Sequence, residues 1–143
     1  MGEQNVVVPK QYFYSGKTGP DPDGLKRALM KSGELAVARG CSAINLAVPK
    51  KGNLDGIMEE VLGEQACDLL QKNNELPLDS ITIYLVTKRV PISFEGPVVA
   101  AWADMEQIKE LNAHYRTKDL IYLAWLDEEL AEFKRAFPVS EEI

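Results

Sequence analysis

Short apolar runs alternate along this chain with stretches in which apolar residues recur at helical spacing. The runs are rich in β-branched residues, which is typical of strands that are buried on both faces of a sheet. Strands that alternate with helices favour a mostly parallel sheet, because each return to the same end of the sheet requires a crossover. The predicted strands comprise residues 6–8, 42–48, 81–87, 98–102 and 120–125.

The helical stretches begin and end at residues that commonly cap helices. The first spans residues 24–39 and is followed by Gly40, which suits a left-handed C-terminal cap. The second is predicted as one continuous helix over residues 53–73, with Asn53 as its N-cap. Asp104 and Asp127 each follow a predicted strand and are expected to cap the two remaining helices.

The connection over residues 88–96 is too short to hold a crossover helix. The strand at 98–102 therefore either pairs antiparallel with the strand at 81–87 or follows it through an irregular link. The sequence leaves both arrangements open.

Together these elements predict an α/β fold with three layers. The expected architecture is a doubly wound, Rossmann-like, mostly parallel five-stranded sheet with helices on both faces, formed by residues 1–143 as a single domain. The composition, 45% hydrophobic and 27% charged, is that of an ordinary globular chain. The order of elements resembles doubly wound nucleotide- and small-molecule-binding folds, but only in architecture, and no motif singles out one family.

Charge and cysteine content narrow the class of function. A net charge of −6 makes nucleic acid an unlikely partner. No apolar run approaches the ~20 residues that a membrane span requires, and the first residues do not resemble a signal peptide, so we expect a cytoplasmic protein. Cys41 and Cys67 lack metal-site or redox spacing and are expected to be reduced core thiols.

Six of the 16 basic residues fall in the loops after the first three predicted strands, although the chain as a whole is acidic. The carboxyl ends of parallel strands meet at one edge of a sheet, where helix N-termini favour negative charge. We therefore expect an anionic ligand, nucleotide- or phosphate-like, at this edge. The six residues are Lys10, Lys17, Lys50, Lys51, Lys88 and Arg89.

Residues 15–18, Ser-Gly-Lys-Thr, match the end of a phosphate-binding loop but not its beginning. The motif needs a glycine where Gln11 stands, and Pro20 and Pro22 prevent a helix from starting at Lys17. No G-x-G-x-x-G fingerprint follows a predicted strand. The sequence thus indicates no particular cofactor.

The aromatic residues 12–14 are expected in a polar loop, where at least one ring can stack on a ligand. The sequence singles out no metal ligand and no catalytic residue, since His114 is the one histidine and Glu95 is an isolated loop carboxylate. The candidate ligand-binding residues are Tyr12, Tyr14, Lys17, Thr18, Lys50, Asn53 and Lys88.

Two functions follow from these observations. The first is an α/β domain that binds an anionic small molecule, with or without catalysing its reaction. The second is a non-catalytic interaction or structural domain that acts as a homo-oligomer. We expect its interface at the edge formed by the last predicted strand or on the final helix, which carries Leu130, Phe133 and Phe137.

Overall fold

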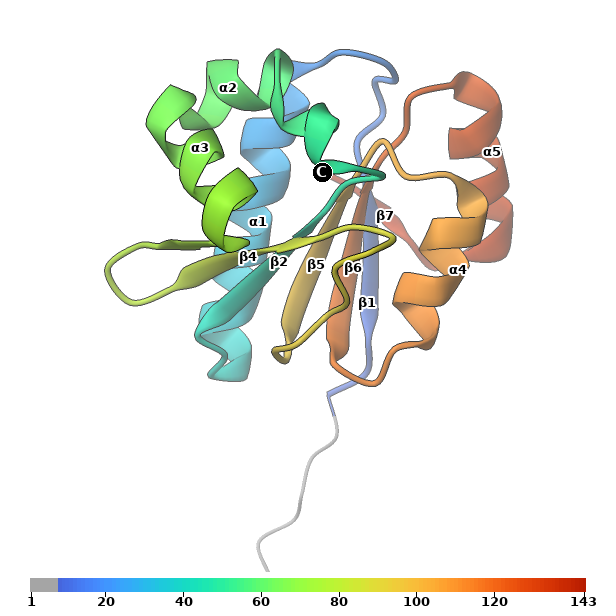
Figure 1. Ribbon diagram of the computed structural model, residues 1–143. Coiled ribbons are helices and arrows are strands. Elements are labelled where there is room, and N and C mark those ends of the chain that lie inside the picture. The colour runs from blue at the N-terminus through green and yellow to red at the C-terminus, as the bar shows by residue number, and fades with distance from the viewer. Residues whose placement is uncertain (1–7) are drawn as a thin grey trace, which may run out of the picture.

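The computed structural model describes residues 8–143 and shows an α/β fold with a seven-stranded, mostly parallel mixed sheet and helices packed against it (Figure 1). The strands are β1 (Gln11–Tyr14), β2 (Ala43–Ala47), β3 (Glu75–Pro77), β4 (Thr82–Val86), β5 (Gly96–Ala101), β6 (Thr117–Leu123) and β7 (Glu141–Glu142). The helices are α1 (Pro22–Arg39), the 3-10 turn η1 (Lys51–Leu54), α2 (Ile57–Leu62), α3 (Glu64–Asn73), α4 (Met105–Ala113) and α5 (Asp127–Ala136).

The strand order is β3-β4-β2-β5-β6-β1-β7, and every pair is parallel except β3 with β4. From β2 the chain moves outward to β4, and from β5 it moves the other way, through β6 to β7. The direction of winding therefore reverses between β2 and β5. The carboxyl ends of the parallel strands lie at the top of Figure 1.

Helices cover both faces of the sheet (Figure 1). Helices α1, α2 and α3 pack on one face, in a core that includes Leu25, Leu46 and Met58. Helices α4 and α5 pack on the other, where Ile108 and Phe133 are fully buried. The prediction of helices on both faces is confirmed, whereas the predicted count of five strands is wrong.

The first strand lies later in the chain than predicted. Residues 6 and 7 are outside the described residues, and Val8 is 49% exposed and belongs to no strand. The strand is instead formed by the aromatic segment 11–14, which was expected in a loop. Successive side chains of a strand point to opposite faces of the sheet, which explains how three consecutive rings are accommodated. Phe13 faces α1, while Tyr12 and Tyr14 face α5.

The predicted second helix is divided into η1, α2 and α3. Gly56 and Gly63 adopt positive φ angles of 73° and 95°, and these left-handed residues end one helical segment before the next begins. Apolar periodicity continues across both breaks, which is why the sequence suggested one helix. Asn53 lies inside η1, and its Oδ1 accepts a hydrogen bond from the Lys50 N–H instead of capping a long helix.

The connection from β4 to β5, residues 87–95 and hereafter the crossover, contains no helix. It passes over β2, and β5 runs parallel to the other central strands. The irregular link is therefore confirmed and the antiparallel alternative is wrong. The crossover covers the sheet beside α4, with Ile92 buried and Phe94 stacked on Tyr84 at a ring separation of 4.1 Å.

Of the four predicted caps, those at Gly40 and Asp104 are confirmed, whereas those at Asn53, described above, and Asp127 are wrong. Gly40 has the left-handed conformation with φ of 70°, and Asp104 Oδ1 accepts a hydrogen bond from Gln107 N at 2.8 Å. Asp127 is the first residue of α5 rather than its cap, and its carboxylate accepts a hydrogen bond from the Thr18 hydroxyl. Strands β3 and β7 were not predicted because they are only three and two residues long.

Of the two surfaces proposed for a homo-oligomer, the strand edge is occupied within the molecule and the final helix is occupied in part, since Leu130 and Phe137 are only partly buried. Strand β6 lies between β5 and β1, so it offers no edge, and the Phe133 side chain is fully buried. Among residues 8–143 we find no helix with the length and apolar character that crossing a bilayer requires.

Both cysteines are free thiols. Cys67 is buried, which raises its pKa to about 11, whereas Cys41 is half-buried.

Candidate functional site

The loops after β1, β2 and β4 emerge at the same end of the sheet, since these strands are parallel to their neighbours. They do not converge on one point. Strands β1 and β2 are separated by β6 and β5, which places the loop of Lys17 roughly 14 Å from that of Lys50 along the sheet. The predicted basic loops therefore form a row along this edge.

Several of the predicted ligand-binding residues already have partners in the protein. Lys88 Nζ lies 3.1 Å from Asp104 Oδ2, and this contact raises the pKa of Lys88. The pKa of Asp104 is lowered, first by the hydrogen bond from the Gln107 N–H and then by Lys88. Thr18 Oγ1 donates to Asp127. Carboxylates of the protein thus occupy two places at which an anion was expected.

Tyr12 and Tyr14 lie in the sheet rather than in the loop above it. The Tyr12 hydroxyl donates to Asn112 Oδ1 at 2.9 Å, and its ring stacks on Phe137 with a centroid separation of 4.4 Å. The Tyr14 ring carries the ammonium of Lys134 over its face at 5.2 Å. Both rings pack beneath α5.

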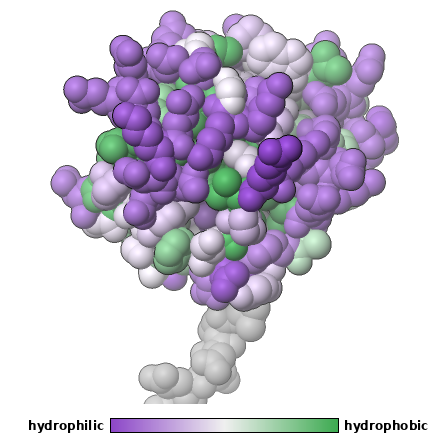
Figure 2. Space-filling model, viewed as in Figure 1, coloured by the Kyte–Doolittle hydropathy of each residue, from purple (hydrophilic) through white to green (hydrophobic). Residues whose placement is uncertain are grey.

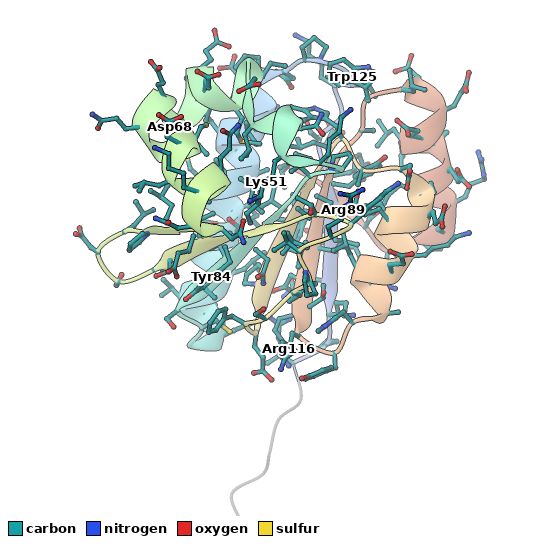
Figure 3. The ribbon with its side chains drawn as sticks, viewed as in Figure 1. Lys51, Asp68, Tyr84, Arg89, Arg116 and Trp125 are labelled. Carbon is teal, nitrogen blue, oxygen red and sulfur yellow. The ribbon has the colours of Figure 1, made fainter. Side chains whose placement is uncertain are left out.

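Lys10 was expected in a loop at this edge, but it directly precedes β1 and so lies at the amino end of the sheet, where its Nζ donates to the backbone oxygen of Asn112. The remaining basic residues differ in how far they are engaged. Lys51 Nζ donates to the backbone oxygen of Gln71, whereas Lys17, Lys50 and Arg89 are exposed. Figure 3 shows Arg89 at the carboxyl-end corner of the crossover, on the side of α4. This corner is also next to Lys88, so two cationic side chains lie where the crossover leaves β4.

One hollow of the protein lies between the crossover and α4. This crossover hollow has a volume of about 170 Å³. Because a helix-free segment covers less of the sheet than a helix would, space remains beside it. Figure 2 shows mostly polar side chains on the face that includes this region. The hollow is lined by Val86, Thr87, Lys88, Pro91, Ile92, Gln107, Glu110, Leu111 and His114.

Helix α4 contributes one face to the hollow. Residues 107, 110, 111 and 114 follow the i, i+3, i+4, i+7 spacing that brings side chains onto the same side of a helix. Leu111 is apolar, whereas Gln107, Glu110 and His114 are polar. His114 Nδ1 accepts a hydrogen bond from Arg116 N at 3.1 Å, so in the neutral ring Nε2 is the donor.

Gln107 is the most buried polar residue of the hollow, with 3% of its surface exposed. Its Nε2 donates to the backbone oxygen of Val48 at 3.1 Å. Its Oε1 is buried and has no hydrogen-bond partner among residues 8–143. An unpaired buried acceptor costs about 1–3 kcal/mol, and native proteins rarely keep one without a reason.

Two further unpaired amide oxygens flank the same crossover. Asn45 donates through Nδ2 to Phe94 O at 3.1 Å, but its Oδ1 has no partner in the described part of the chain. Asn74, whose Oδ1 is also unpaired there, lines a second hollow of about 250 Å³ on the other side of the crossover. Three of the five buried, unpaired side-chain atoms of residues 8–143 therefore lie around the crossover, and the other two, Ser15 Oγ and Asp21 Oδ2, lie at the start of α1.

A strained residue marks the point where the winding reverses. Trp102, directly after β5, has a φ of 63°, which is rare for a bulky side chain and costs about 1–3 kcal/mol. Its ring packs edge-on against Trp125 at 5.9 Å, and Figure 3 shows Trp125 at the carboxyl end of the sheet. Such strain is often found near functional sites.

Of the seven predicted ligand-binding residues, Lys88 lines the crossover hollow and the other six do not. Sequence reasoning missed Thr87, Gln107, Glu110 and His114, which do line it. The available signal was the polar stripe 107, 110 and 114 beside the apolar Leu111. Among residues 8–143, no group of three or more side chains is placed to hold a metal ion.

Comparison of the chain with protein-family models, with curated proteins and with solved structures gives no match in any of the three. The functional argument therefore rests on the geometry of the site.

Proposed function

We propose that this protein binds a small molecule in the crossover hollow, with an anionic group of the ligand directed toward Lys88 and Arg89. The proposal treats the fold as a doubly wound, Rossmann-like sheet. In such sheets ligands bind outside the carboxyl ends of the strands, near the point where the winding reverses. The crossover leaves β4 at this end of the sheet, one strand away from the reversal between β2 and β5.

The observation that carries the proposal is the combination of apolar walls with a buried, unpaired acceptor. Val86, Ile92 and Leu111 provide apolar surface, while Gln107 Oε1 lacks a donor among the described residues. Ligand sites typically combine a mostly apolar lining with a few polar groups that fix the orientation of the ligand. The crossover hollow has both features.

The size of the hollow indicates which part of a ligand is enclosed. At about 170 Å³ it is smaller than the roughly 300–1,000 Å³ of most ligand pockets. A compact apolar body fits inside, and a charged substituent stays at the surface. Arg89 is exposed and accessible to such a substituent, whereas Lys88 beside it is half-exposed and would have to exchange its contact with Asp104.

A thermal-shift screen tests this function. The panel contains nucleotides, phosphosugars, dinucleotides and simple anions, and a ligand at 100 times its Kd should stabilise the protein by about 2.7 kcal/mol. Glu110→Trp places an indole at the mouth of the hollow and should abolish the shift. Glu106→Trp is the matched control, because Glu106 is an exposed residue one turn earlier on α4 that does not line the hollow.

A second comparison distinguishes the hollow from the row of basic loops. The double variant Lys17→Ala/Lys50→Ala should keep the shift if the ligand binds in the hollow. A shift that is lost in this variant but kept in Glu110→Trp would place the ligand above β1 and β2 instead. The absence of any shift with the whole panel would contradict the proposed function.

A homo-oligomeric interaction domain is the alternative. The observation that favours it is an apolar groove on α2 and α3, lined by residues that include Leu62, Ala66, Leu69 and Leu76. Leu69 is 40% exposed, although most leucines of the sheet core are buried. Light scattering coupled to size exclusion would reveal a dimer, and Leu69→Lys should dissociate it if this groove forms the interface.

A further inference from the structure

The Gln107 side-chain amide has an orientation that its surroundings determine. Its Nε2 donates to the backbone oxygen of Val48, which can only accept a hydrogen bond. The opposite assignment would place two acceptors against each other. Oε1 is therefore the atom that stays unpaired, and any partner that satisfies it must be a hydrogen-bond donor.

Thr87 presents the complementary group in the same hollow. Its Oγ1 accepts hydrogen bonds from the N–H groups of Arg89 and Val90, each at 3.1 Å, and the residue is 8% exposed. Both contacts use the oxygen as acceptor, so the hydroxyl proton is left to donate. Among residues 8–143 no group accepts that proton within hydrogen-bond distance. Two residues that line the hollow thus carry one unused acceptor and one unused donor.

Resting on the proposed function, we infer that the enclosed part of the ligand is a nucleobase with an amino group beside a ring nitrogen, as in adenine. The amino group donates to Gln107 Oε1, and the ring nitrogen accepts from the Thr87 hydroxyl. Adenine presents this donor next to an acceptor on one edge. Its flat faces suit the apolar walls formed by Val86, Ile92 and Leu111.

Binding of this kind requires the crossover to shift. Gln107 Oε1 has less than 1 Å² of accessible surface, so a ligand cannot reach it without displacing a neighbour. The crossover is the neighbour that we expect to shift, because it belongs to no helix or strand. Its contacts with the rest of the protein include the hydrogen bond from Asn45 Nδ2 to Phe94 O, a long 3.5 Å contact from Arg116 to Ile92 O, the ion pair of Lys88 with Asp104 and the stacking of Phe94 on Tyr84.

Two nucleotides that differ by a single group test the inference. Adenosine 5′-monophosphate carries the amino group, and purine riboside 5′-monophosphate lacks it but is otherwise identical. By isothermal titration calorimetry, the wild-type protein should bind the first at least about tenfold more tightly, because the second leaves Oε1 unpaired. In Gln107→Met the ratio of the two dissociation constants should fall to about one, with Gln65→Met, an exposed position on α3, as control.

The outcomes separate this inference from the function on which it rests. If the wild-type protein binds both nucleotides equally and Glu110→Trp abolishes that binding, the amino-group inference is wrong while binding in the hollow stands. If neither binds but a phosphosugar stabilises the protein and Glu110→Trp abolishes that effect, the nucleobase is wrong and the site is right. If nothing binds, both fail. Should Gln107→Met not fold, the wild-type ratio alone decides.

Discussion

Asp119, at the amino end of the sheet, and Gln107, near the carboxyl end, are both almost completely buried, but their hydrogen bonding differs. The Asp119 carboxylate accepts hydrogen bonds from Arg39 Nε and Nη2, at 2.6 and 2.7 Å, and from the Gln11 N–H at 3.1 Å. Gln107 Oε1 has no donor within residues 8–143. The described residues supply all the hydrogen-bond donors around the Asp119 carboxylate, whereas they supply none to Gln107 Oε1.

The Asp119 network also fixes the segment that precedes β1. Arg39 donates to the backbone oxygens of Val8 and Pro9, and its pKa is raised chiefly by the hydrogen bond to Asp119. The contacts join α1, β6 and the start of β1. They have a structural role, and no hollow that we describe is lined by Arg39 or Asp119. The comparison shows that burial of a polar side chain does not by itself point to a ligand, and our proposal for Gln107 rests on its unpaired oxygen together with the hollow beside it.

The largest effect is expected for Asp119→Asn. The change leaves the Arg39 guanidinium largely buried without its counter-charge, and breaking such a pair costs about 3–5 kcal/mol. Urea unfolding monitored by circular dichroism measures the loss. Glu95→Gln is the control, because Glu95 is more than half exposed and its contact with Lys118 is long, at 3.8 Å. A loss below about 1 kcal/mol would remove the contrast between the two ends.

A smaller loss of stability is expected for Tyr122→Phe, which removes a buried hydrogen bond that is formed near the carboxyl end of the sheet. The Tyr122 hydroxyl donates to the backbone oxygen of Ala103 at 2.6 Å, and both groups are buried. Burial raises the pKa of Tyr122, so this proton is retained throughout the ordinary pH range. Leaving the Ala103 oxygen unpaired should cost about 1–3 kcal/mol. Tyr115→Phe, at a 67% exposed position, should change the free energy of unfolding hardly at all.

The lowered pKa of Asp104, at the carboxyl end of the sheet, predicts that the free energy of unfolding depends on pH. Its pKa is lowered in the folded state, so its contribution to stability is complete above the unfolded-state pKa and is lost as the pH falls through the folded-state value. Asp104→Asn keeps an acceptor for the helix cap but loses the charge. The wild-type advantage, expected near 1 kcal/mol or less, should be largest at neutral pH and vanish in acid. An advantage that grows in acid would refute the assignment.

Gln107→Met should have the smallest effect on stability. The substitution removes an unpaired acceptor while it leaves the Val48 oxygen without its donor, and these two changes oppose each other. We expect a net change of less than about 1 kcal/mol by urea unfolding. A loss as large as that of Asp119→Asn would show that Gln107 is a structural residue and that the two ends of the sheet do not differ.

The central part of the fold could be predicted because its signals are local. Apolar runs at 42–48, 81–87, 98–102 and 120–125 each overlap an observed strand, since a buried strand needs little besides apolar, β-branched residues. The first strand was misplaced because Val6 to Val8 gave a stronger apolar signal than the Gln-Tyr-Phe-Tyr segment that forms β1. Its partners on β6 lie more than 100 residues away in sequence, where no local pattern reveals them.

The candidate site was less predictable, because it arises from the space between two segments. The sequence identified Lys88 from its position after a strand. It did not identify Gln107 or His114, because a polar residue on a helix is usually exposed, and only the path of the crossover buries this face of α4. Thr18 and Asn53 were plausible ligand-binding residues because short polar side chains in loops form hydrogen bonds readily. In the structure they use this ability within the protein, Thr18 with the Asp127 carboxylate and Asn53 with the Lys50 N–H.

The most direct test of the central claim is an NMR titration of the ¹⁵N-labelled protein with adenosine 5′-monophosphate. We predict that the amide signals of residues 87–90, 92 and 107–114 shift together, while those of Gln11, Arg39 and Asp119 at the amino end stay unchanged. Shifts confined to residues 16–19 and 50–53 would contradict this account, because the nucleotide would then bind the row of basic loops and not the crossover hollow.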